Sequence, residues 1–242
     1  MVMTISWPGG VIIVTTWSAL CFRGVSSMDL DPAQLELDVL FGTGRMEPFM
    51  HHTGNDIAKA QRAYIWNAAV ASRYLTRVGF VEVGLRNILD GSLVHITGSD
   101  RWWEDFYPYL SQYCQKSIDK TLRYKDFAGD YPRDQFIAKS DFGLWTALLH
   151  KDNAKNLNQL ANHAFSAKRG EIYHCMNGVR HLRNRAAHHV CFLGDDHEAH
   201  LHQIEAALDY IDRDLHHFIN EADNLRDLLS NYETFLAGKC HL

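Results

Sequence analysis

Residues 57–93 read IAKAQRAYIWNAAVASRYLTRVGFVEVGLRNILDGSL, and this stretch decides the fold. Its apolar and small residues recur mostly at steps of three and four, which is the period of a helix with one buried face. The pattern is nearly uninterrupted, so we expect one long helix or two helices that join near Gly79. The recurring residues are Ala60, Tyr64, Ala68, Tyr74, Val78, Val81, Leu85, Ile88 and Leu89.

The rest of the chain also favours helices. Asp31-Pro32 is typical of a helix start, and the glycines of residues 42–44 should end that helix. No run of alternating apolar and polar residues suggests a sheet, so the predicted class is all-α. Further helices are expected over residues 110–124, over 142–149 behind the capping pair Ser140-Asp141, and over 168–187, with a loop over 126–134.

In the last part of the chain, apolar residues alternate in steps of three and four from Leu201 to Leu236, which is the seam of a heptad repeat. A capping-box-like pair, Asp195 with Glu198, precedes the seam, and residues 220–224 are a candidate break. The seam predicts a helical bundle with a long C-terminal helical segment. Packing inside the bundle explains it, and so does a dimer interface.

The chain has 242 residues, of which 46% are hydrophobic and 22% charged, as in an ordinary globular protein. Its formal net charge of −5 argues against binding nucleic acid through the whole surface, so any such contact needs a local basic patch. The five cysteines are scattered, and none forms a metal-type pair. We therefore expect reduced thiols in a cytoplasmic protein.

The first residues contain an apolar run, Val11-Ile12-Ile13-Val14, which could be taken for a signal peptide. No positive charge precedes it, Pro8-Gly9-Gly10 interrupts it, and it is too short to span a bilayer. We expect no membrane partner. Residues 1–27 are predicted to be a disordered or dispensable extension, and residues 28–242 a single helical domain.

The stretch most typical of an active site is Arg183-Asn184-Arg185-Ala186-Ala187-His188-His189. Its arginines, amide and adjacent imidazoles can hold a phosphate and move a proton near neutral pH. Residues 166–189 carry five basic side chains against Glu171 alone, a balance of +4. The basic residues outside the motif are candidates for RNA contacts: Lys168, Arg169 and Arg180.

Arg183 and His188 suit one reaction in particular. A neutral histidine can take a proton from a hydroxyl, and a charged arginine can hold a phosphate. Attack of an RNA 2′-hydroxyl on the adjacent phosphodiester needs only these groups, with no metal or other cofactor. Because five residues separate the pair, it converges most easily if the helix ends near His188 or if a second copy supplies the partner. A helix end with solvated charges explains the same residues without any function.

The wider pattern resembles a known family. Arg183-Asn184-x-x-x-His188 matches the R-x4-6-H signature of HEPN-domain ribonucleases, and the string from Leu182 to His189 resembles the Abi-like (abortive infection) bacterial family. Val190-Cys191 departs from the Glu-Pro that this family commonly has there. Three further segments resemble the family in the same order: Tyr64-x-Trp66-Asn67, the Glu82-x3-Arg86-Asn87 helix, and Asp141-Phe142-Gly143-Leu144-Trp145.

The resemblance covers about residues 40–220 and implies a HEPN-like bundle that forms a homodimer with two motifs at one cleft. It implies a metal-independent endoribonuclease that acts on RNA as a toxin or phage-defence effector, with an antitoxin or regulatory partner left open. Arg183 and His188 would be the catalytic pair, and Asn184 would orient them. Supporting residues would be Arg185, His189, Glu82, Arg86 and Asn87, although Glu82 and Arg86 also form an ordinary i,i+4 salt bridge.

Two other functions stay open. A zinc site could use His188, His189, His197, His200 and His202 with Asp195 or Asp196, although the spacings match no known zinc motif. A HEPN-like bundle could instead bind RNA, a nucleotide or a partner protein without cleavage. The tryptophans could stack on bases, but such residues more often fill a core: Trp66, Trp102, Trp103 and Trp145.

Overall fold

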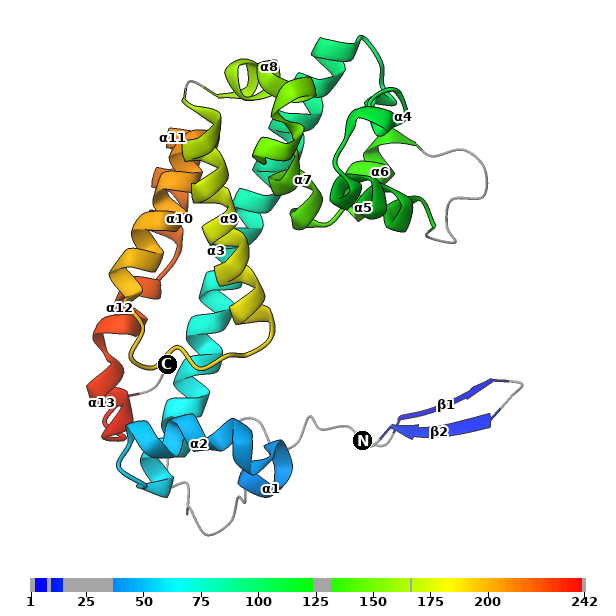
Figure 1. Cartoon of the computed structure of the whole chain (residues 1–242). Coiled ribbons are helices and arrows are strands. Elements are labelled where there is room, and N and C mark those ends of the chain that lie inside the picture. Colours follow the sequence, from blue (N-terminus) through cyan, green and yellow to red (C-terminus); the bar gives the residue numbers. More distant parts are fainter. Residues whose placement is uncertain (1–2, 8–9, 15–36, 124–131, 166, 241–242) are drawn as a thin grey trace.

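The computed structural model describes residues 3–7, 10–14, 37–123, 132–165 and 167–240 (Figure 1). Apart from one hairpin, the described chain is helical, as predicted. The hairpin pairs β1 (Met3–Trp7) with β2 (Gly10–Val14) in antiparallel register, an element that the sequence did not predict. It lies in the N-terminal extension, whose dispensability stays a prediction, and the rest of residues 1–27 lies outside the described residues.

The stretch that decides the fold forms a single helix, α3 (Ile57–Thr97), of 41 residues. At 1.5 Å per residue it is about 60 Å long. Asp56 caps its start, where Oδ1 accepts a hydrogen bond from the Lys59 amide, and Gly98 ends it in the left-handed conformation at φ 69°. Gly79 does not divide the helix, because the buried residues on both sides outweigh its cost of about 1 kcal/mol. Ala68, which we placed on the apolar face, is exposed.

Two short helices precede α3. They are α1 (Leu37–Phe41) and α2 (Thr43–His52), and they are separated by Gly42 at φ 87°. The helix does end within the predicted break at residues 42–44, but Gly42 alone separates the two helices, since Thr43 and Gly44 already belong to α2. The helix start at Asp31 lies outside the described residues. The sequence did not predict α2, which buries Met46 and Phe49 and packs against α3.

The middle of the chain folds into short helices around the C-terminal half of α3. The predicted helices over 110–124 and 142–149 are confirmed, and Asp141 caps the second by accepting from the Leu144 amide at 2.8 Å. The tryptophans named above are all buried, so they belong to the core. The elements are α4 (Trp102–Asp105), η3 (Tyr107–Tyr109), α5 (Gln112–Leu122), α6 (Arg133–Lys139), α7 (Phe142–Leu148), η4 (Lys151–Asn153) and α8 (Ala154–Ala164).

Neither α6 nor α8 was predicted. The loop expected over residues 126–134 lies partly outside the described residues, and α6 already begins at Arg133. This helix inserts Phe136 between the tryptophans, with its ring stacked on Trp103 at a centroid distance of 4.0 Å. Packing of one aromatic residue therefore fixes a helix that local composition did not indicate.

The C-terminal part consists of α9 (Arg169–Ala187), α10 (His197–Ile211), α11 (Arg213–Ala222), α12 (Leu225–Ser230) and α13 (Tyr232–Leu236). The heptad seam is thus divided among four helices rather than carried by one long helix. Packing in the bundle accounts for buried Leu201, Ile204 and Leu208, whereas Phe218 is 61% exposed. The dimer interface stays a prediction.

Two details of this segment follow from side chains. The predicted break at residues 220–224 is confirmed, since α11 ends at Ala222 and α12 begins at Leu225. Buried Arg77 on α3 holds this connection by donating to Asp223 at 2.5 Å and to Asn220 at 2.8 Å. The prediction that Asp195 caps the following helix is wrong. Asp196 caps α10, with Oδ1 accepting from the Ala199 amide.

The bundle is organised around α3. Helices α9 and α10 both pack along it, and they pack against each other. Among the described residues, no helix combines the length and the apolar character that a bilayer crossing requires.

Candidate active site

Helix α9 positions the motif, and its bounds agree with the predicted helix over 168–187. One face is buried against α3 and α10 through Ile172, Met176, Val179, Leu182 and Ala186. Because these residues follow each other in steps of three and four, the motif residues between them point away from the core.

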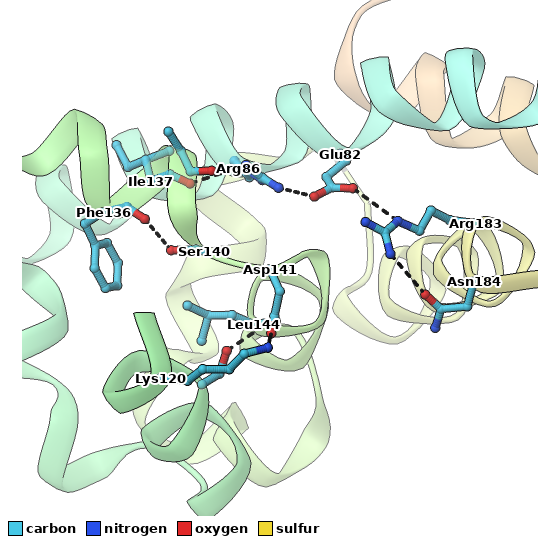
Figure 2. Close-up of polar contacts among 12 residues, drawn as sticks. Glu82, Arg86, Lys120, Phe136, Ile137, Ser140, Asp141, Leu144, Arg183 and Asn184 are labelled. Carbon is cyan, nitrogen blue, oxygen red and sulfur yellow. Dashed lines mark hydrogen bonds and ion pairs between the residues drawn. The ribbon is translucent and has the colours of Figure 1, made fainter. Parts of the chain in front are cut away.

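Arg183 is held from α3 by a carboxylate. Its Nε lies 3.8 Å from Oε2 of Glu82, and the Arg183 side chain is 43% exposed while that of Glu82 is 12% exposed. Oε1 of the same carboxylate accepts from Arg86, which also donates to the carbonyl oxygen of Ala138 on α6 at 3.0 Å. Figure 2 shows this chain of contacts from Arg183 through Glu82 to Arg86. Glu82 therefore links α3 to α9 and holds a half-exposed guanidinium, while its partner Arg86 links α3 to α6.

Asn184 lies directly after Arg183 on α9 and contacts its guanidinium. Its Oδ1 lies 3.5 Å from Nη1 of Arg183, at the outer limit of a hydrogen bond (Figure 2). The structure thus brings four of the predicted site residues together: Glu82, Arg86, Arg183 and Asn184. Asn87 also lies on α3 and is exposed, with no hydrogen bond from its side chain within the described part of the chain.

His188 lies where α9 ends. It is the C-cap residue, and its amide donates to the Asn184 carbonyl oxygen at 3.0 Å. His189 follows in the left-handed conformation at φ 53°, which non-glycine residues seldom adopt. Both imidazoles are exposed, and that of His188 makes no hydrogen bond or ion pair with any described residue. His188 is therefore available to a substrate.

A cavity of about 330 Å³ lies beside this helix end, lined by residues of α2 and by His188, His189 and Cys191. Arg45 of α2 reaches across it, and its Nη1 donates to the His189 carbonyl oxygen at 3.2 Å. Burial raises the pKa of the Cys191 thiol, so this sulfur stays protonated near neutral pH and is a poor nucleophile. Arg45 is thus a cation that lines the same cavity as His188, and no pattern in the sequence pointed to it.

Asn67 on α3 fastens the chain after the motif. Its Nδ2 donates to the Val190 carbonyl oxygen at 3.2 Å, and its Oδ1 accepts from the Phe192 amide at 2.7 Å. The side chain is only 2% exposed. In the sequence, Asn67 stood out only through the family resemblance. An amide side chain on the apolar face of a helix is the pattern that would have indicated its structural role.

Arg183 and His188 do not converge within one chain. The helix ends at Ala187 with His188 as its C-cap, as a convergent pair would need, yet no hydrogen bond or ion pair joins the side chains of Arg183 and His188 among the described residues. Arg183 contacts Glu82 near the middle of α3, while His188 faces the cavity beside α2. In a single chain the two halves of the motif therefore have different surroundings, α3 for Arg183 and the cavity beside α2 for His188.

Arg185 serves the fold around the motif. It forms a two-point ion pair with Asp195, at 2.5 and 3.1 Å, and its guanidinium lies 4.8 Å from the centroid of the Phe192 ring. His200 also bonds Asp195 at 2.8 Å. On its own, burial would raise the pKa of the Asp195 carboxyl, but the bonds from Arg185 and His200 outweigh it and hold that pKa below its usual value. This cluster fixes the segment between α9 and α10.

The predicted RNA-contacting residues are spread along α9. Lys168 and Arg169 lie at its start, about 21 Å from Arg183 along the helix. Lys168 is exposed beside Glu171, and Arg169 donates to the Leu149 carbonyl oxygen at 2.6 Å. Arg180 lies one turn before Arg183, so it is the one of these three that adjoins the motif.

The histidines do not gather into a zinc site. Among the described residues, no group of three or more histidine, cysteine, aspartate or glutamate side chains is placed to hold a metal ion. His197 instead bonds the Tyr74 hydroxyl through Nδ1 at 2.8 Å. Burial lowers the pKa of His197, which favours the neutral ring.

Comparisons with protein-family models, with curated proteins and with solved structures found no match for this chain.

Proposed function

We propose that this protein is a metal-independent endoribonuclease of the HEPN type. The observation that carries the proposal is the state of the two key side chains. Arg183 is half exposed and held by a single carboxylate, and His188 is exposed without a partner among the described residues. Phosphodiester cleavage requires a cationic group and a titratable group that are held in place but remain accessible to the substrate.

The proposed reaction is an internal transfer at phosphorus. A neutral His188 takes the proton of the RNA 2′-hydroxyl, and the 2′-oxygen then bonds to the adjacent phosphorus. The bond from phosphorus to the 5′-oxygen breaks, and that oxygen takes a proton from a protonated imidazole. The products are a 2′,3′-cyclic phosphate and a 5′-hydroxyl. Arg183 stabilises the charge that develops on the phosphate oxygens.

A homodimer resolves the divergence of the two residues. If two chains pair beside the motif, Arg183 of one chain meets His188 of the other, and this one imidazole takes the proton of the 2′-hydroxyl and then gives it to the leaving 5′-oxygen. Exposed apolar side chains lie close to these residues in sequence, with Phe80 and Val83 within two residues of Glu82 on α3 and Val190 directly after His189. Exposed apolar residues beside a polar site are typical of a protein interface.

The biological role as a toxin or abortive-infection effector rests on the family resemblance alone. Cleavage of cellular RNA would arrest the host and stop phage growth. This part of the proposal is tested by expressing the wild type beside His188→Ala and sequencing the RNA ends that appear.

The decisive experiment is cleavage of labelled RNA in excess EDTA, with analysis of the product ends. We expect cyclic phosphate ends, and a loss of about two orders of magnitude or more for Arg183→Ala or His188→Ala. Arg183→Lys should not restore the rate, because a point charge cannot replace the planar guanidinium. Equal cleavage by wild type and both alanine variants would show that the motif is structural.

The second candidate is a non-catalytic module that binds RNA, a nucleotide or a partner protein. The divergence of Arg183 and His188 within one chain favours it. Mixing Arg183→Ala with His188→Ala separates the two functions, because a composite site regains one intact Arg183–His188 pair in the mixed dimer. Recovery of part of the activity would support the nuclease, and binding of RNA without cleavage by any mixture would support the module.

A further inference from the structure

A groove of about 400 Å³ lies between α5, α7 and α9, one helical turn from Arg183. Its walls carry Tyr113 from α5, Gly143 from α7 and Asn177 and Arg180 from α9, with His150 and Tyr173 at one end. These side chains combine one guanidinium, one carboxamide and several aromatic rings. From this combination we infer that the groove binds one nucleotide of single-stranded RNA beside the scissile bond, an inference that rests on the proposed function.

Arg180 is prepared to bind an anion. The Asn177 carboxamide oxygen accepts hydrogen bonds from its Nη2 at 2.9 Å and from its Nε at 3.3 Å. Within the described part of the chain, Nη1 of Arg180 makes no hydrogen bond and no carboxylate lies within 4 Å of this guanidinium. A neutral partner thus orients the guanidinium without cancelling its charge, which leaves it free for a phosphate.

The aromatic rings supply a surface for a base. Tyr113 is 54% exposed, and the rings of His150 and Tyr173 meet edge to face at a centroid distance of 4.9 Å. The carboxylate of Asp152 on the rim lies 3.1 Å from Nδ1 of His150, a contact that is an ion pair only when this imidazole is protonated. An exposed tyrosine ring beside a guanidinium with no carboxylate partner among the described residues is typical of single-strand binding, in which bases stack and phosphates meet arginine.

Gly143 keeps the groove open. A Cβ atom at this position would lie 2.3 Å from the Tyr113 hydroxyl oxygen, so any side chain would displace the tyrosine ring. Because Tyr113 is half exposed, the ring can move away at small cost to stability. The same Cβ would lie 3.2 Å from Oδ1 of Asp141, the oxygen that caps α7, so Gly143→Ala changes the groove and also crowds this cap.

The groove and the motif follow one line on α9. Asn177, Arg180 and Asn184 are separated by three and four residues, so they lie on one face of the helix. A strand that occupies the groove continues over the next turn to Arg183 and Asn184. Arg180 thus becomes a substrate-binding residue, and the cleavage site has a binding pocket on one side.

The test measures RNA binding by the inactive full chain carrying His188→Ala. The probe is a fluorescein-labelled RNA single strand of mixed sequence, about ten nucleotides long, and its binding is measured by fluorescence anisotropy. Adding Arg180→Ala, Tyr113→Ala or Gly143→Ala should each weaken binding about tenfold. Arg180→Ala should also reduce the slope of log K against log salt by about 0.7.

The matched controls are Arg213→Ala and Phe218→Ala on α11, which remove an exposed arginine and an exposed aromatic ring far from the groove in sequence. They should leave the affinity within about twofold. Melting curves establish that every variant is folded.

The outcomes separate the groove from the nuclease. If the groove variants bind as tightly as their parent, or if the parent does not bind the strand, the inference about the groove is overturned whether or not the wild type cleaves RNA. If the groove variants bind weakly while the wild type shows no cleavage in EDTA, the groove stands and the nuclease proposal fails. Equal affinity for a duplex of the same sequence would also count against a single-strand pocket.

Discussion

Glu82 on α3 and Arg183 on α9 meet at 3.8 Å, and the carboxylate that orients the arginine is more deeply buried than the arginine itself. The same carboxylate binds Arg86, so Glu82 carries one contact for the fold and one for the candidate site. A change at this residue should therefore affect stability and cleavage by separate routes.

We expect Glu82→Gln to lower the free energy of unfolding by about 1–3 kcal/mol, because Arg86 keeps its charge in a partly buried place without a counter-ion. Cleavage should fall as Arg183 loses its anchor. In the double variant with Arg86→Met, stability should largely return while cleavage stays low. Urea unfolding and the EDTA cleavage assay measure the two effects, and a joint recovery of both would contradict separate roles.

His189→Gly should raise the free energy of unfolding by about 1 kcal/mol, because glycine adopts the left-handed conformation that His189 holds at φ 53° without strain. Cleavage should stay within a few-fold of wild type, in contrast to His188→Ala. Thermal unfolding and the cleavage assay decide this. A large loss of cleavage would give His189, not His188, the proton-transfer role.

Asn67→Ala should cost about 1–3 kcal/mol, since it leaves the buried Phe192 amide and the Val190 carbonyl oxygen without their partner. Asn87→Ala is the matched control, because it removes an exposed asparagine of the same helix and should change stability by about 0.5 kcal/mol or less. Chemical denaturation of both variants is sufficient. Equal values would show that the residues after the motif are fixed by other contacts.

Asp223→Ala should be among the most destabilising single changes, at about 3–5 kcal/mol, because Arg77 is 1% exposed and would be left as a buried unpaired charge. Asp227→Ala removes an exposed carboxylate nearby and should have little effect. Circular dichroism during urea unfolding distinguishes the two. A small loss for Asp223→Ala would mean that Asn220 alone satisfies Arg77.

Stability should fall as the pH drops below about 6.5, the usual pKa of histidine. Burial lowers the pKa of His197 in the folded state, while Asp195 and Asp196 oppose the shift and His200 and Arg185 add to it. As the pH falls, His197 therefore takes up a proton in the unfolded chain before it does so in the folded chain. The stabilising contribution of His197 is fully present above about pH 6.5 and is lost on acidification. The lowered pKa of Asp195 adds a second loss below about pH 4.

His197→Gln tests the first of these losses, because an amide can still meet the Tyr74 hydroxyl but does not titrate. Its melting temperature should vary less than that of the wild type between about pH 7 and pH 5. Identical slopes for the two proteins would assign the loss to another histidine.

The helices with strong local signals were predictable. For α3 and α9 the apolar period was long, and for α7 the Asp141 cap fixed the start. The C-terminal heptad seam suggested one long helical segment because its apolar period continues across Asp212. The chain instead starts a new helix there, with the Asp212 side chain accepting a hydrogen bond from the Leu215 amide. A local side-chain bond overrides a periodic apolar pattern there.

The candidate site was predictable as a set of residues but not as a geometry. Spacing could place Glu82 near Arg86, yet only the packing of α3 on α9 shows that Glu82 also reaches Arg183. Arg45 was beyond sequence reasoning, because it lies on a helix that the sequence did not predict, 144 residues before the carbonyl it binds.

The length of α3 also bears on how the protein is made. Its N-terminal half is closed by the last helices, with Arg62 bonded to the Leu236 carbonyl oxygen across 174 residues and Trp66 to that of Leu228 across 162. At ordinary rates of translation, roughly 10–35 s pass between the synthesis of these partners. Until then α3 keeps an uncovered apolar surface on the ribosome. The contacts that close the N-terminal half of α3 can therefore form only after the last helices have been synthesised.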